Sequence, residues 1–169
     1  MSPTTRRQAR AVALFLLVVL LFVTSFRMAV VRGNSMEPTY HDGQVVLVRR
    51  RGWLSPPLRR GDVVLLRKDR DVIIKRIFRL PGDVVDDTPL DRRALARGDL
   101  ADYYEQQTLP TPRGPETHLT VPDHFLVVLG DNARVSEDSR IFGPVPERDV
   151  LGTVIGAPPS PNGVPSGHP

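Results

Sequence analysis

The sequence of 169 residues contains no cysteine and only two lysines, Lys68 and Lys75. Without cysteine the chain has no disulfide framework, no thiol nucleophile and no cysteine-bound metal site. Its four histidines lie in no catalytic or metal-binding spacing, and no glycine-rich phosphate loop is present. We therefore expect neither a metal ion nor an organic cofactor.

Net charge and composition further restrict the classes of function that this chain can have. The net charge is +4, and the basic residues are mostly scattered, with one short run at 49–51. A single cluster of this kind is a weak sign of nucleic-acid binding, so we expect no nucleic-acid partner. Hydrophobic residues make up 40% of the chain, which is enough to bury a core.

A strongly apolar run lies near the N-terminus. Residues 11–26 carry no charge, and residues 1–10 before them contain three arginines. A bilayer core needs about 20 apolar helical residues, a length that 11–31 reaches if Arg27 extends its charged end to the interface. No small-x-small cleavage site follows, which favours an uncleaved transmembrane anchor over a removed signal peptide. The arginines predict that residues 1–10 are cytoplasmic and that the chain after the anchor is extracytoplasmic.

After the anchor the pattern changes to short β-branched runs separated by turn residues. We predict a mostly β domain with an antiparallel sheet over 32–156, preceded by one transmembrane helix. A polar stretch rich in proline and threonine, 86–122, predicts a long loop or insertion, with a short helical pattern at 92–104. The proline-, glycine- and serine-rich end, 157–169, predicts a disordered tail. The predicted strands are 44–48, 62–66, 71–78, 125–129 and 150–155.

Ser35 follows the predicted anchor on what should be irregular backbone. Gly33 precedes it by two residues and Pro38 follows it by three. Glycine permits unusual dihedral angles and the close approach of another chain, so this setting can expose a hydroxyl and backbone N–H groups. Taken alone, the segment is equally typical of an ordinary loop serine.

Lys75 lies in the middle of a predicted strand. Alternate side chains of a strand share a face, so Ile73 and Ile77 flank this lysine on its own face. Such burial lowers the pKa of a lysine, and a neutral amine is a competent general base. The alternative is an edge-strand lysine whose stem lets the charge reach water, as expected for Lys68 in its charged turn.

A third polar segment, 130–140, follows the predicted strand 125–129. It concentrates hydroxyls, carboxylates and arginines and has few apolar residues. Such a loop can form a dense network of charge-assisted hydrogen bonds. A solvated hairpin loop is the alternative interpretation.

In order and spacing, these segments together resemble bacterial signal peptidase I, the family of serine–lysine dyad signal peptidases. The resemblance covers roughly residues 6–155. The residues that carry it are Ser35-Met36-Glu37-Pro38-Thr39, Gly61-Asp62-Val63-Val64, Lys75-Arg76, Gly82-Asp83, Gly130-Asp131-Asn132, Ser136, Asp138-Ser139-Arg140 and Gly143-Pro144-Val145.

The resemblance implies a membrane-anchored serine endopeptidase that cleaves signal peptides from exported precursor proteins. Ser35 would be the nucleophile and Lys75 its general base, with the Ser35 backbone N–H as one oxyanion donor. Ser136 would hydrogen-bond to the lysine and orient it. Asp138 and Arg140 would form a pair that holds the loop.

The resemblance also implies how a substrate binds. Family members bind an extended signal peptide as an added β-strand and accept small residues at the first and third positions before the cut. Met36 and Ile74, next to the dyad residues, are expected to line the pocket. Some members carry a serine as second oxyanion donor where this chain has Gly33. The second donor is therefore left open, with backbone or water as alternatives. The implied partners are precursor proteins and the lipid bilayer.

Three other interpretations account for part of the sequence. A Ser-His-Asp hydrolase is disfavoured because no histidine lies in a motif. A non-catalytic membrane-anchored β-domain would be expected to lack the serine or the lysine. A protease of the same family dedicated to one exported or pilin-like substrate has the same sequence features and stays open.

Overall fold

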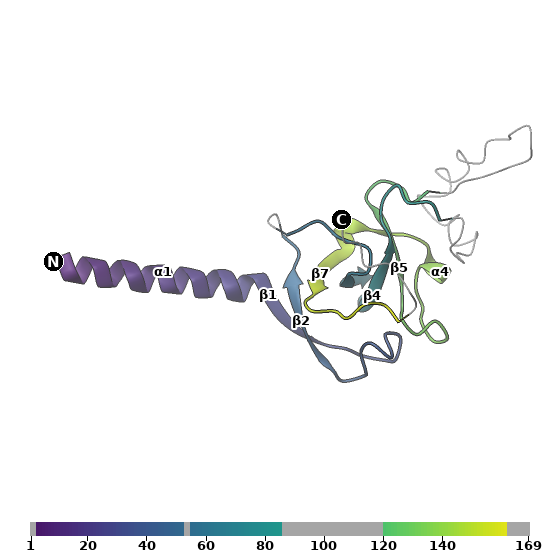
Figure 1. Ribbon diagram of the computed structural model, residues 1–169, viewed down its shortest axis with the longest axis horizontal. Coiled ribbons are helices and arrows are strands. Elements are labelled where there is room, and N and C mark those ends of the chain that lie inside the picture. The colour runs from purple at the N-terminus through teal and green to yellow at the C-terminus, as the bar shows by residue number, and fades with distance from the viewer. Residues whose placement is uncertain (1–2, 53–54, 86–119, 162–169) are drawn as a thin grey trace, which may run out of the picture.

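An antiparallel sheet forms the body of the molecule, and one long helix projects from it (Figure 1). The computed structural model describes residues 3–52, 55–85 and 120–161. In this part of the chain the strand order is β1-β2-β7-β3-β4-β5-β6, and all neighbouring pairs are antiparallel. The elements are α1 (Pro3–Ser25), β1 (Phe26–Val30), β2 (Val45–Arg50), β3 (Val63–Lys68), β4 (Asp71–Arg79), β5 (Phe125–Leu129), α4 (Ser139–Phe142), β6 (Val145–Pro146), the 3-10 helix η2 (Glu147–Asp149) and β7 (Val150–Val154).

The prediction of a mostly β, antiparallel domain is confirmed. Each of the five predicted strands is present, and β5 has the predicted bounds. The charged segment between β3 and β4 is a tight hairpin turn, in which Asp69 adopts a left-handed φ of 54° that aspartate tolerates. Two strands, β1 and β6, and the short helices α4 and η2 were not predicted.

The N-terminal segment differs from the predicted anchor range. Helix α1 ends at Ser25, and residues 26–30 pair with β2 as the edge strand β1, so the range 11–31 includes part of the sheet. The apolar character of this strand makes it look like a continuation of the helix in sequence. Across the described ranges, no helix combines the length and the apolar character that crossing a membrane requires.

Apolar side chains are buried on both faces of the central strands. Along β3, Val63 and Leu65 belong to one core cluster, whereas Val64 and Leu66 belong to a second cluster on the opposite face. This alternation explains why β3 is a continuous apolar run rather than a half-polar strand. The two clusters place β3 and its hairpin partner β4 at the centre of the domain.

Two predicted irregular segments are partly described. Thr120 at the end of the predicted loop 86–122 forms a β-bridge with Val84, and its neighbour Val121 is buried. The helical pattern at 92–104 lies outside the described residues. The start of the predicted tail packs on the domain, because Ala157 contacts a core cluster.

The close packing of β2 against β7 generates a prediction at Gly152. A methyl group at this position would lie 2.4 Å from the Arg49 carbonyl oxygen and 2.7 Å from a Val48 methyl group. Gly152→Ala should therefore lower the free energy of unfolding by about 1–3 kcal/mol, the cost of overpacking. Gly52→Ala is the matched control, because nothing lies within 4 Å of its added methyl group. Thermal unfolding of the detergent-solubilised chain measures both, and equal melting temperatures would contradict the prediction.

Candidate active site

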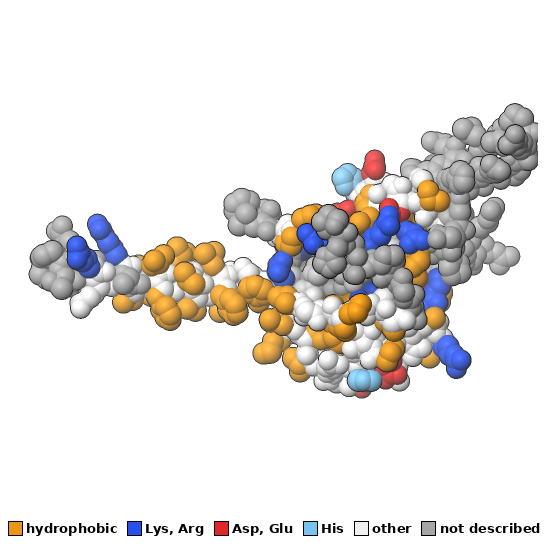
Figure 2. All heavy atoms as spheres, viewed as in Figure 1, with side chains coloured by type: hydrophobic (Ala, Val, Ile, Leu, Met, Phe, Trp, Pro, Cys, Tyr) orange, Lys and Arg blue, Asp and Glu red, His pale blue; other side chains and the backbone are white. Residues whose placement is uncertain are grey.

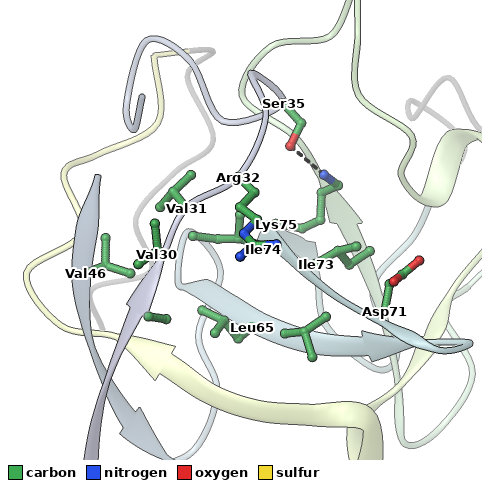
Figure 3. A pocket seen from close by; sticks show the side chains of 12 residues that line it. Val30, Val31, Arg32, Ser35, Val46, Leu65, Asp71, Ile73, Ile74 and Lys75 are labelled. Atoms are coloured by element: carbon green, nitrogen blue, oxygen red, sulfur yellow. Dashed lines mark hydrogen bonds between the residues drawn. The ribbon is translucent and has the colours of Figure 1, made fainter. Parts of the chain in front are cut away.

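Ser35 and Lys75, which are far apart in sequence, meet at one end of the sheet. Ser35 begins a turn that spans residues 35–39 after β1, and Lys75 lies in β4. The Lys75 Nζ atom donates a 2.8 Å hydrogen bond to the Ser35 hydroxyl oxygen (Figure 3). The predicted proximity of this serine and this lysine is thus present in the structure.

The side chain of Lys75 is buried from solvent. The residue is 4% exposed, and in the described part of the chain Ser35 is the hydrogen-bond partner of its Nζ atom. Burial lowers the pKa of Lys75, although the negative charges of Asp138 and Glu137 oppose that shift. The neutral amine, which can accept a proton, is therefore favoured more than in an ordinary lysine.

Two backbone contacts fix the turn that carries Ser35. The Asn132 N–H donates to the Ser35 carbonyl oxygen at 3.0 Å, which joins the turn to the segment after β5. Before the serine, Gly33 has a φ of 77°, and its N–H donates to the Asp42 carboxylate at 2.7 Å. A residue with a side chain would be strained in this left-handed conformation, which accounts for glycine at this position.

A buried ion pair lies directly behind the site. The Arg76 guanidinium donates to both carboxylate oxygens of Asp131, at 2.9 and 2.7 Å, and both side chains are almost fully buried. Arg76 also donates to the carbonyl oxygens of Gly61 and Pro158, and Thr39 donates to Asp131. The pair therefore connects the serine turn, β4, the segment after β5 and the chain after β7.

Neither Arg76 nor Asp131 was assigned a role from sequence. A signal was nevertheless present, because a charged residue next to Lys75 in a strand must point to the opposite, apolar face. A carboxylate directly after a buried strand is a natural partner for such a residue. The sequence did not show which of several carboxylates takes that place.

The predicted pairing of Asp138 with Arg140 is present in the structure. Two guanidinium nitrogens of Arg140 donate to the two oxygens of Asp138, at 2.8 and 2.6 Å. The same carboxylate accepts the backbone N–H of Gly130 and caps α4. Burial raises the pKa of Asp138, but the hydrogen bonds from Arg140 and Gly130 outweigh it and hold the pKa below its usual value.

Ser136 differs from the expectation. The residue is buried close to the site, but no hydrogen bond from it to Lys75 is found among the described residues. Its hydroxyl lies beside Asp138 instead and helps to lower the pKa of that carboxylate. The hydroxyl packs closely against Gly130, where an added methyl group would lie 2.1 Å from the Ser136 oxygen. The same methyl group would lie 2.6 Å from the Ser35 carbonyl oxygen, so only glycine fits between the two serines.

A groove of about 520 Å³ leads to the Ser35 hydroxyl. Its walls are the end of β1 with the residues that follow, 29–32, and the first half of β4, 71–75 (Figure 3). Ile74 lines the groove, as expected for a pocket residue. Met36 does not line it, because its side chain is fully buried in the core cluster beneath the turn.

Comparison with known proteins identifies the family of the chain. A family model described as signal peptidase, peptidase S26, matches residues 5–156. Signal peptidase IB of Staphylococcus aureus is 32% identical over 141 residues, which cover 73% of each chain. Signal peptidase I of Bacillus amyloliquefaciens is 33% identical over 156 residues, which cover 85% of this chain and 83% of the relative.

The fold, the buried serine–lysine contact and these matches define the class of the protein as a serine endopeptidase, a hydrolase. Within that class, the chain belongs to the signal peptidase family, peptidase S26. Cleavage of signal peptides from exported precursors is the activity of this family.

The ion pair behind the site generates a stability prediction. Asp131→Ala leaves the buried Arg76 charge uncompensated and should lower the free energy of unfolding by about 3–5 kcal/mol. Asp123→Ala is the matched control, because Asp123 is exposed and no ion pair of it is found in the described chain. The melting temperatures of both variants measure the difference. An Asp131→Ala protein that melts with the control would show that the pair contributes little.

Proposed function

We propose that this chain cleaves signal peptides with Ser35 as the nucleophile and Lys75 as the general base. The observation that carries the proposal is the 2.8 Å hydrogen bond between the Ser35 hydroxyl and a lysine amine that is buried at the end of an open groove. Both requirements of this chemistry are supported together, namely proximity and a lowered pKa of the base.

The reaction proceeds in two halves. The neutral amine of Lys75 takes the proton of the Ser35 hydroxyl while the oxygen attacks the scissile carbonyl carbon. The resulting ammonium gives that proton to the leaving amine, the peptide bond breaks, and an acyl-enzyme ester on Ser35 remains. Water then attacks the ester with the same amine as base, which releases the signal peptide and restores the serine.

The Ser35 backbone N–H is the proposed donor to the oxyanion. In the described part of the chain it has no intramolecular acceptor, so it is free to bind the developing negative charge. Gly33 offers no hydroxyl as a second donor, and its positive φ disfavours a serine there. A backbone N–H or a water molecule is left for that role.

The substrate is proposed to bind as an extended strand in the groove. Strand β1 is an edge strand, and the segment 71–75 of β4 precedes the residues that pair with β5. Both strands therefore have unpaired backbone N–H and C=O groups toward the groove, which an extended peptide can satisfy. Ile74 and Leu65 line this groove, so small side chains fit best near the cut.

The segment around α1 is proposed to hold the domain at the bilayer, with the N-terminus cytoplasmic and the domain extracytoplasmic. The large apolar side chains from Val12 to Val23 are exposed along the helix, as Figure 2 shows. Exposed apolar side chains continue into the sheet, where Met28 pairs with Leu47 on one face. A surface of this extent is costly in water and suits lipid.

The first test replaces the proposed base. Lys75→Arg should abolish cleavage of a precursor with an Ala-x-Ala site, because a guanidinium does not deprotonate in this pH range. Ser35→Ala should be equally inactive. Lys68→Arg, at the end of β3 and away from the groove, is the matched control and should cleave normally. Substantial activity of Lys75→Arg would make the general-base assignment wrong.

The second test is the pH profile of cleavage. The rate should rise with pH through the pKa of Lys75, because only the neutral amine accepts the serine proton, and the midpoint should lie below the usual lysine range. Glu137 stabilises the ammonium, so Glu137→Gln should move the midpoint to lower pH. A midpoint that moves to higher pH would contradict this arrangement.

The third test concerns topology. Protease added to intact spheroplasts should degrade the domain after residue 31, because the arginines before the apolar run favour a cytoplasmic N-terminus. A tag fused to the N-terminus should be protected until the cells are lysed. Protection of the domain in intact spheroplasts would exclude the proposed orientation.

A further inference from the structure

A second cavity lies where the domain meets α1, away from the groove that holds Ser35. Its volume is about 360 Å³, and it lies between the end of β2, the end of β7 and the segment 55–59. Three arginines line it, Arg49, Arg51 and Arg59, against a single carboxylate, Asp62. The lining therefore carries an excess of positive charge.

The positive charges of this cavity are poorly satisfied within the chain. In the described residues, the guanidinium groups of Arg49 and Arg59 make no hydrogen bond or salt bridge, although both interact electrostatically with Asp62. Arg51 pairs with Glu147 at 3.4 Å, but both side chains are about 30% exposed, and such pairs contribute little. Asp62 accepts the Arg59 backbone N–H at 2.9 Å. Several guanidinium donors thus remain available to a ligand.

The cavity has a definite place relative to the helix. Arg49 lies directly opposite Phe26 in the β1–β2 pairing, and Phe26 is the first residue after α1. Figure 2 shows Lys and Arg side chains next to the point where the apolar helix enters the domain. A group bound here would therefore lie at the level where the proposed bilayer ends.

We propose that this cavity binds a phosphate group, carried by the headgroup of an anionic lipid. A guanidinium presents paired donors that match the geometry of a phosphate, and it keeps its charge at any physiological pH. The proline and aliphatic residues of the cavity, Pro56, Pro57, Val154 and Ile155, offer apolar contact to the rest of the headgroup. The lipid source rests on the proposed placement of α1 at the bilayer, whereas the phosphate chemistry does not.

The test is lipid binding to the full chain in neutral detergent, measured by native mass spectrometry. Phosphatidylglycerol should bind more tightly than phosphatidylcholine, and high salt should weaken its binding. The double substitution Arg49→Gln/Arg59→Gln should reduce its affinity by roughly 25-fold, at about 5-fold for each arginine near a lipid surface. Arg67→Gln, at the distant β3–β4 hairpin, is the matched control and should bind like wild type.

Further variants and a second ligand distinguish lipid binding from a folding defect and from binding of free phosphate. Arg49→Lys/Arg59→Lys preserves the charge and should lose less affinity than the glutamine variant, which separates lipid binding from a folding defect. Binding of millimolar inorganic phosphate without any binding of phosphatidylglycerol would retain the phosphate site but overturn its lipid occupant. An equal loss in Arg67→Gln, or no loss in the double variant, would overturn the proposal. Ser35→Ala should bind lipid normally, so failure of the catalytic proposal and failure of this one are distinguishable.

Discussion

The bidentate ion pair between Arg76 and Asp131 is the interaction on which the rest of the site depends. Both groups are almost fully buried, so each charge is tolerable only because the other is present. The pair also binds Thr39 of the serine turn and the carbonyl oxygens of Gly61 and Pro158. Segments that lie up to about 120 residues apart in sequence are therefore held in one arrangement, which fixes the distance between the serine turn and β4.

Strand geometry couples this pair to the chemistry. Lys75 and Arg76 are consecutive in β4, so their side chains point to opposite faces of the sheet. The arginine finds a buried carboxylate on its face. The lysine meets a serine hydroxyl and an apolar surround, which lowers the pKa of its amine. The same strand therefore supplies a charged residue for stability and the lysine that is proposed as the general base.

Much of the fold could be predicted because its signals are local. The five predicted strands are β-branched runs. The composition of each run and the turn residues beside it are enough to predict a strand. The segment 26–30 was misread because an apolar edge strand directly after an apolar helix has no boundary signal in sequence. The surroundings of Ser136 could not be predicted, because its close approach to Gly130 depends on how two loops pack.

The sequence by itself determined the family, because a serine, a strand lysine and a polar loop occur in the order that the family has. Motif order is a property of the chain, and the residue types alone limit what each group can do. Only the tertiary structure decided that Lys75 is buried and that Arg76 pairs with Asp131. It also decided that the Met36 side chain packs in the core and does not line the groove. The physical reason is that burial and partner choice depend on residues distant in sequence, whereas strand formation depends on neighbours.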